Sequence, residues 1–183
     1  MLFFMEAYSM EMTRRKMLNN SRFLCFMLDN ENYCIDILRV KELMGMTDIT
    51  PLPGTPGFIR GVINLRGLII PVIDLRLKFG LPFRDYSKRT CIIVVEVTYE
   101  NEIVLMGIVV DAIQEVVSIP EEKLSKIPYI NARIKSEYIK GIADTQDGIK
   151  IVLDVLKVLN EKELAVVKET AAVPKAETVE NTK

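Results

Sequence analysis

Four aspartates at the ends of apolar segments come closest to a catalytic or metal-binding set in this sequence. Asp36, Asp74, Asp111 and Asp154 each close or follow a run of apolar residues. Carboxylates can coordinate a divalent cation or act as a general acid and base pair. Aspartates at strand ends also accept hydrogen bonds from turn and helix-start amides, and such caps recur when a chain repeats itself. We interpret the four as structural caps, with a small metal-binding β-barrel enzyme as the alternative.

The sequence contains no histidine, the side chain that most often serves as general base or metal ligand. Serine or cysteine nucleophiles paired with histidine are therefore excluded. There is no glycine-rich phosphate loop, and the cysteines lack the CxxC spacing of metal and redox sites. We predict a protein that is not an enzyme and has no catalytic residues, metal or cofactor.

Two charged residues, Glu42 and Arg66, stand in apolar surroundings. Arg66 falls at the tip of a predicted β-hairpin whose strands span 58–63 and 68–73, and Glu42 lies in a short apolar strand. A charge among apolar neighbours is costly unless it is paired or solvated. The two side chains either face each other as an ion pair or are unrelated and solvated, and the sequence leaves both alternatives open.

Two glycines, Gly61 and Gly141, lie inside predicted strands. Glycine weakens strand pairing and usually marks a bulge or a close approach of another backbone. Either a bend of the barrel or the approach of a partner would explain both positions.

The chain has 183 residues, enough for one large core or two small cores that share an interface. Cys25, Cys34 and Cys91 are an odd number and lie in apolar runs, which predicts buried free thiols in a reducing cytoplasm. The net charge of −1, without a basic stretch, argues against nucleic acid as a partner. No apolar run approaches the ~18 residues that span a bilayer, so we expect no membrane insertion.

Apolar, β-branched segments separated by short polar turns predict a mainly β protein. The predicted strands span residues 22–28, 33–37, 40–46, 58–65, 68–73, 90–98, 103–110, 113–119, 138–144 and 149–153. Helix is expected as one turn at 74–79 and as a C-terminal segment at 155–168. Residues 1–20 are predicted to be a flexible extension and residues 170–183 a disordered tail.

Short segments in the first half of the chain recur in the second half. The segment FIRG at 58–61 is matched 80 positions later by YIKG, and VIDL at 72–75 is matched at the same offset by VLDV. A second match, VKEL at 40–43 with IQEV at 113–116, lies 73 positions apart. We infer two similar β subdomains, because the spacing within the hairpins is the same in both halves.

The hairpin segment FIRGVINLRGLIIPVIDLRLKFG, preceded by YCIDILRVKEL and followed by GIVVDAIQEVVSI and EYIKGIA, closely resembles CheW-type coupling proteins of bacterial chemotaxis. The resemblance covers about residues 22–159. It implies a non-catalytic domain at 21–169 made of two packed, intertwined SH3-like five-stranded β-barrels, with a boundary near 80–90 and a C-terminal helix.

This resemblance implies an adaptor that joins the cytoplasmic tip of a methyl-accepting chemoreceptor to the regulatory domain of the histidine kinase CheA. Such a protein would be cytoplasmic and associated with the membrane chemoreceptor array. The positions implied to contact the receptor or the kinase are Val40, Glu42, Gly61, Arg66, Ile113, Val116 and Gly141. The apolar members are equally consistent with barrel core. A CheW-like scaffold of another receptor pathway, twitching or CheV-type, is the alternative within the family.

Overall fold

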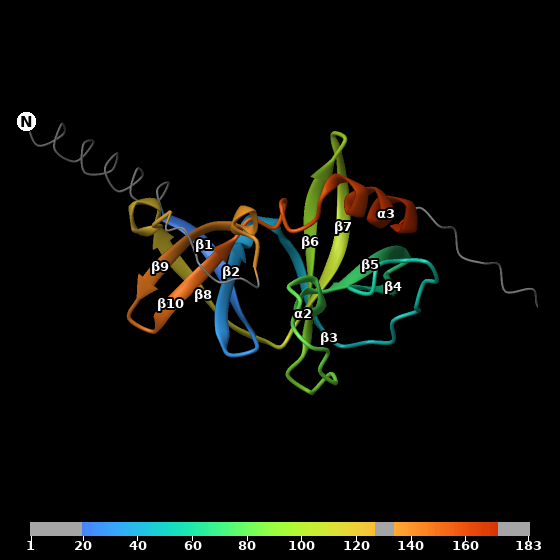
Figure 1. Ribbon diagram of the computed structural model, residues 1–183, viewed down its shortest axis with the longest axis horizontal. Helices are drawn as coiled ribbons and strands as arrows, with labels where there is room; N and C mark the ends of the chain where they lie inside the picture. The colour runs from blue at the N-terminus through green and yellow to red at the C-terminus, as the bar shows by residue number, and fades with distance from the viewer. Residues whose placement is uncertain (1–19, 127–133, 172–183) are drawn as a thin grey trace, which may run out of the picture.

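The protein consists of two β-barrels that share a core. The computed structural model describes residues 20–126 and 134–171, in which ten strands form two five-stranded sheets. Figure 1 shows these sheets as two separate bodies in contact, with the strands from the two ends of the chain in one of them. We call that one the terminal barrel and the other the central barrel. The predicted mainly β fold with two five-stranded units and a C-terminal helix is confirmed.

The strands of each barrel follow the same order. The central barrel has the order β3-β6-β7-β5-β4, with β3 (Val40–Gly45), β4 (Ile59–Leu65), β5 (Leu68–Asp74), β6 (Cys91–Tyr99) and β7 (Glu102–Val110). The terminal barrel has the order β8-β1-β2-β10-β9, with β1 (Asn20–Leu28), β2 (Glu31–Asp36), β8 (Ala112–Pro120), β9 (Ile139–Thr145) and β10 (Gly148–Leu153). Each of the ten predicted strands corresponds to one of these, with ends that agree to within two residues.

The two barrels are interleaved along the chain. Strands β1 and β2 begin the terminal barrel, the next five strands build the central barrel, and β8 to β10 complete the terminal one. The predicted boundary near residues 80–90 falls between β5 and β6, which belong to the same sheet. A single point in the sequence therefore does not separate the barrels, because β2 pairs in parallel with the distant β10.

The internal similarity extends to individual hydrogen bonds. Thr50 exchanges two backbone hydrogen bonds with Val62, at 2.9 and 2.8 Å, and Ser125 does the same with Ile142 at 2.9 and 3.0 Å. After each hairpin, the amide of an aspartate donates to the residue that precedes the hairpin: Asp74 to Phe58 and Asp154 to Tyr138, both at 2.8 Å. The two hairpins are thus held in their barrels by the same contacts.

A row of aromatic rings joins the barrels. Phe26 and Tyr33 from the first hairpin, Phe79 from the central barrel and Tyr138 from the terminal barrel form successive ring pairs, with centroids 6.2, 6.0 and 6.1 Å apart. All four belong to the largest buried cluster, which contains residues of both barrels. Each barrel interior has a smaller apolar cluster of its own. Because the shared cluster is closely packed, it fixes the orientation of one barrel against the other.

Two helices support this arrangement. The one-turn helix α2 (Leu75–Lys78) begins at Asp74, whose carboxylate accepts from the amide of Leu77 at 3.3 Å, as predicted. Helix α3 (Glu161–Ala171) packs on β5, β6 and β7. Its predicted start at residue 155 is wrong. Val155, Val158 and Leu159 are buried in the shared core without being helical, and the helix begins only after Asn160, which caps the amide of Glu163 at 3.0 Å.

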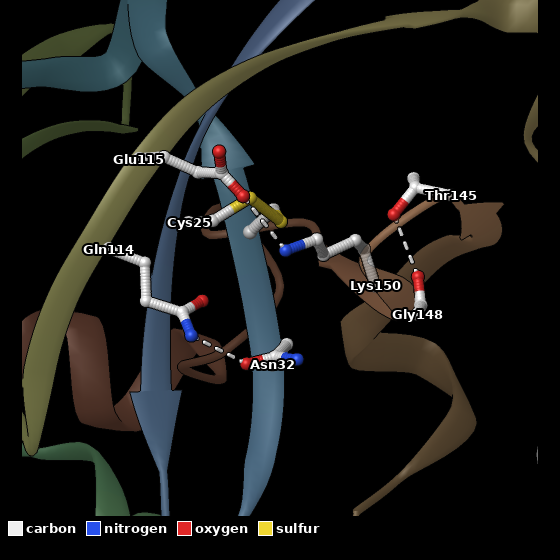
Figure 2. The surroundings of a disulfide bond; sticks show 8 residues. Cys25, Asn32, Gln114, Glu115, Thr145, Gly148 and Lys150 are labelled. Carbon is white, nitrogen blue, oxygen red and sulfur yellow. Dashed lines mark hydrogen bonds and ion pairs between the residues drawn. A yellow bond between two sulfur atoms is a disulfide. The ribbon is translucent and has the colours of Figure 1, made fainter.

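The prediction of three buried free thiols is wrong for two of them. Cys25 and Cys34 form a disulfide and are fully buried, whereas Cys91 is a partly exposed free thiol (Figure 2). The physical reason is the register of the first hairpin. Its two-residue turn pairs Leu28 with Glu31, which sets Cys25 directly opposite Cys34 with Cα atoms 4.1 Å apart.

The predicted flexible extension and disordered tail lie almost wholly outside the described residues. Asn20 already belongs to β1, and residues 170–171 belong to α3, so these three positions depart from the prediction. Within the described part of the chain, no helix has the length and apolar character needed to cross a membrane.

Equivalent glycines of the two hairpins provide a test of this packing. Gly61 has φ of 137°, and a Cβ added there would lie 2.0 Å from the carbonyl oxygen of Thr50. A Cβ at Gly141 would meet Leu124 at 3.3 Å. We expect Gly61→Ala to lower the free energy of unfolding by about 3 kcal/mol or more, and Gly141→Ala by about 1 kcal/mol or less. Urea unfolding of both variants measures the difference, and equal losses would contradict the close backbone approach at Gly61.

Candidate functional site

Glu42 and Arg66 form a solvent-accessible ion pair on the central barrel. The Arg66 guanidinium donates to the Glu42 carboxylate at 2.9 Å, which confirms that the two side chains face each other. Arg66 and Gly67 both have positive φ and make a two-residue turn, held by a 2.8 Å hydrogen bond from the Gly67 amide to Asn64. The pair therefore connects β3, at one end of the sheet, with the tip of the β4–β5 hairpin at the other end.

This ion pair is too exposed to serve mainly as a stabilising contact. The side chain of Arg66 is 78% exposed, and pairs at such positions typically contribute only ~0 to 1 kcal/mol. Large apolar side chains lie next to both partners in sequence: Leu43 beside Glu42 and Leu68 beside the turn are 46% and 58% exposed. Glu42 and Leu43 are successive residues of β3 and project from opposite faces of the strand. An edge that carries both an exposed arginine and exposed leucines is typical of a docking surface.

The terminal barrel has an equivalent edge on β8. Ile113, Glu115 and Val116 match Val40, Glu42 and Leu43 at the constant offset of 73 residues. Val40 and Ile113 are partly buried and pack against the shared core, whereas Val116 is 43% exposed. Val40 and Ile113 therefore belong partly to the core, as the sequence alternative allowed, and Val116 is available at the surface.

The equivalent glutamates have different partners. Arg66 of the central barrel corresponds to Gln146, 80 positions later, so the second hairpin tip lacks the arginine. Glu115 instead pairs at 3.1 Å with Lys150, whose side chain lies inside the terminal barrel and is only 2% exposed. The two edges thus share a backbone plan and differ in the charge that they present.

Gly61 and Gly141 are buried and are not part of either exposed edge. At Gly61 the β4–β5 register shifts between Ile59 and Gly61, and the backbone of Thr50 in the same barrel approaches closely, so features of the barrel itself account for this glycine. The seven predicted site residues therefore fall into three groups. Val40, Glu42 and Arg66 lie on the central barrel, where Glu42 and Arg66 are joined directly, Ile113 and Val116 lie on β8 of the terminal barrel, and the two glycines lie inside strands.

Sequence reasoning missed a polar cleft of about 270 Å³ between the barrels. Its central residue is Arg76, which is buried and bonds to Asp111 at 2.6 Å and to the carbonyl oxygen of Pro82 at 3.2 Å. Asp29, in the turn between β1 and β2, lies 3.6 Å from Arg76 and 3.3 Å from Arg84. The available signal was the position of Arg76 in a strongly apolar run, where a buried charge requires a partner.

Asp74 lines the same cleft and is buried. Burial raises the pKa of its carboxyl above the usual 3.8, although the amide of Leu77 and the hydroxyl of Tyr86 donate to it and act in the opposite direction. Burial also raises the pKa of Tyr86, with the nearby Asp74 charge as the second cause. The cleft thus contains a carboxyl group that is poorly solvated when ionised.

The strand-end aspartates do not assemble into a metal site. Asp36, Asp74 and Asp154 each accept a hydrogen bond from a nearby backbone amide, at 2.9, 3.3 and 3.2 Å, which confirms their interpretation as caps. Asp111 instead accepts from Arg76 and from the amide of Asp29. Among the residues that the structure describes, no group of three or more His, Cys, Asp or Glu side chains could hold a metal ion.

Comparison with known proteins identifies the family to which this chain belongs. Residues 22–163 match the family model of the CheW-like domain. The chain is 38% identical over 149 residues to "Chemotaxis protein CheW" of Klebsiella aerogenes, covering 81% of this chain and 87% of that protein. It is 33% identical over 148 residues to the protein of the same name in Treponema pallidum, covering 80% and 87%.

A solved structure is similar as well. The scaffolding protein TtCheW from Thermoanaerobacter tengcongensis matches with a TM-score of 0.70 and 38% identity, over 79% of this chain and 97% of that one. The matched 79% of this chain is longer than either barrel, so the match includes residues of both barrels.

Arg76 and Arg84 both contact Asp29 and Asp111, so substituting each in turn tests which arginine stabilises the fold. The Arg76 side chain is 5% exposed and that of Arg84 is 60% exposed. We expect Arg76→Met to lower the free energy of unfolding by about 3 kcal/mol, because it leaves Asp111 without its main cationic partner. The matched variant Arg84→Met should cost about 1 kcal/mol or less. Chemical denaturation measures both losses, and similar values for the two variants would rule out a structural role specific to Arg76.

The raised pKa of Asp74 predicts a particular pH dependence. Between pH 3.8 and the raised pKa, the folded state binds more protons than the unfolded state, so the free energy of unfolding falls as the pH rises through this window. Asp74→Asn keeps an oxygen that can cap α2 but does not titrate. We expect the stability of the variant relative to wild type to increase with pH across this window and then level off. Parallel profiles, measured by urea unfolding from about pH 4 to about pH 8, would contradict this.

Proposed function

The chain belongs to the family of CheW-like domains, and from this premise we propose that it is a non-catalytic adaptor that couples chemoreceptors to a histidine kinase. In this proposal its partners are the regulatory domain of the kinase CheA and the cytoplasmic tip of a methyl-accepting chemoreceptor. The protein would act in the cytoplasm as part of the membrane-associated receptor array. No nucleic acid, cofactor or catalytic step is involved.

The observation that carries this proposal is the exposed Glu42–Arg66 pair with its apolar neighbours. Leu43 and Leu68 present apolar surface to solvent at the same edge of the barrel, and the ion pair leaves much of the Arg66 guanidinium free for further hydrogen bonds. Arginine and exposed leucine together provide the anchoring and orienting groups of a protein interface. A kinase domain that docks on this edge would bury the leucines and place an acceptor against Arg66.

The second edge makes the adaptor bivalent. Val116 on β8 exposes an apolar side chain at the position equivalent to Leu43, and Glu115 beside it supplies a negative charge. The polar cleft between the barrels, which Arg76 and Asp111 line, is a third surface, and the receptor tip would meet polar side chains there. Because the shared core holds the barrels in one orientation, partners on these surfaces would be held at a fixed spacing.

Each single contact is expected to be of modest strength. An interface of ~800 Å² per partner with micromolar affinity is sufficient, because an array joins many copies and multiplies weak contacts through their effective concentration. An adaptor of this kind requires rigidity rather than high affinity.

The direct test is calorimetric titration with the regulatory domain of CheA from the same cell. We expect micromolar binding that EDTA does not alter. Arg66→Glu should weaken it at least about tenfold, because it removes the donor and places a second negative charge beside Glu42. Its melting temperature should fall by no more than about 2–4 °C, since the lost pair is exposed. Unchanged affinity of the folded variant would refute a role for this edge in kinase binding.

A charge-reversed double variant distinguishes a direct contact between Arg66 and the partner from an effect of the ion pair on the position of the hairpin tip. Glu42→Arg combined with Arg66→Glu restores the ion pair in the opposite sense. If the partner contacts Arg66 directly, binding should stay weak in the double variant. Recovery of wild-type affinity would instead show that the pair only holds the hairpin tip against β3.

A further inference from the structure

The interior of the terminal barrel differs chemically from that of the central barrel. The central interior is apolar, with Ile63, Ile70 and Val72 on the hairpin strands. The residues 80 positions later are Ala143, Lys150 and Val152, so a lysine takes the place of an isoleucine. The Cys25–Cys34 disulfide fills the space beside Ala143 and Val152. A disulfide and a buried lysine therefore occupy a position that the other barrel fills with hydrocarbon.

This interior lies directly beneath the β8 edge. β8 is at the end of its sheet, next to β1, and their register shifts at Cys25: Leu24 pairs with Val116 and Phe26 with Ile113. Residues 114–115 form a bulge opposite Cys25 as a result. From this bulge Glu115 reaches inward to Lys150, and Figure 2 shows both side chains beside the disulfide.

We propose that Cys25 and Cys34 are a reversible thiol–disulfide pair whose redox state controls the conformation of the β8 edge. Reduction uses a small or protein dithiol. One thiolate of the dithiol attacks a cysteine sulfur, the Cys25–Cys34 bond breaks, and a mixed disulfide forms. The second thiol of the dithiol resolves it, which leaves two cysteine thiols and an oxidised dithiol, with two electrons and two protons transferred. The oxidised dithiol drives the reverse reaction.

Lys150 couples this chemistry to the edge. The disulfide is neutral, so the Lys150 ammonium pairs with Glu115. Reduction places two separate sulfur atoms near Lys150, each able to accept a weak hydrogen bond from the ammonium, and these compete with Glu115 for Lys150. The two sulfurs must also separate from a bond of about 2 Å to the roughly 3.5–4.0 Å of nonbonded atoms in a closely packed interior. Both effects loosen the bulge that presents Glu115 and Val116.

Hydrogen exchange of the isolated protein provides the test. A Cys91→Ser background removes the third thiol, and equilibration with dithiothreitol or its oxidised form prepares the two states, verified by thiol titration. We expect amide exchange in residues 112–120 to be at least about tenfold faster in the reduced form. The strand β6 of the central barrel serves as an internal control and should change less than about twofold. Equal exchange of β8 in both forms, or thiols that never oxidise, would overturn the proposal.

A pair of lysine variants tests the coupling. Lys150→Met removes the ammonium and keeps an unbranched side chain, so it should reduce the redox effect on β8 exchange to less than about twofold. Lys150→Arg retains the charge and should preserve the effect. A full redox effect in Lys150→Met would refute coupling through this residue.

The consequence for binding rests on the proposed function. Because the kinase regulatory domain is proposed to dock first on the central-barrel edge, we expect reduction to weaken about tenfold only the binding of a second copy at the β8 edge. Absence of binding by both forms would count against the proposed function alone, because the exchange experiment does not need a partner. Equal binding by both forms, together with unchanged β8 exchange, would count against the redox proposal alone.

Discussion

The aromatic row between the barrels is the contact on which the other surfaces depend. Phe79 leaves the end of α2 and inserts between Tyr33 and Tyr138, so a ring of the central barrel lies within the aromatic core of the terminal barrel. Such rings bury large apolar areas and pack in few orientations. The inter-barrel cleft and the two edge strands consequently keep a fixed relation to each other. A protein that acts by holding partners at set positions needs such a rigid junction.

Burial separates the charges that maintain this junction from those available to partners. Arg76 and Lys78 are largely withdrawn from water, and each has a close carboxylate partner, Asp111 at 2.6 Å and Glu163 at 2.6 Å. Lys78 also lies over the ring of Phe58 at 4.6 Å, and its pairing attaches α3 to the central barrel. Loss of one member of such a pair leaves a poorly solvated charge. The Glu42–Arg66 pair has the opposite character, since water can solvate either partner, and its geometry is available for recognition.

The two barrels show how one plan can acquire two chemistries. The shared hydrogen bonds at Thr50 and Ser125 hold the two hairpins in equivalent places, so the same plan carries different side chains at its edges. In the central barrel the charge that faces the edge glutamate comes from an exposed hairpin tip, and in the terminal barrel it comes from the interior through Lys150. The Glu115–Lys150 pair therefore connects a surface residue to the interior of the terminal barrel. An exposed tip cannot do this, because solvent screens it from the interior.

The sequence by itself determined the strands, the hairpins, the repeat and the aspartate caps, because these follow from local periodicity and turn chemistry. It did not reveal the Cys25–Cys34 disulfide: the odd cysteine count and the apolar surroundings predicted free thiols, and the two-residue turn that sets the two residues opposite each other is seen only in the structure. Only the tertiary structure decided which distant strands pair, that β1 and β2 belong with β10, and that Arg76 meets Asp111 between the barrels. It likewise explained Gly61, whose strand passes against the backbone of Thr50. These features depend on contacts between residues far apart in the chain, and a strand's own pattern of apolar residues does not specify its neighbour.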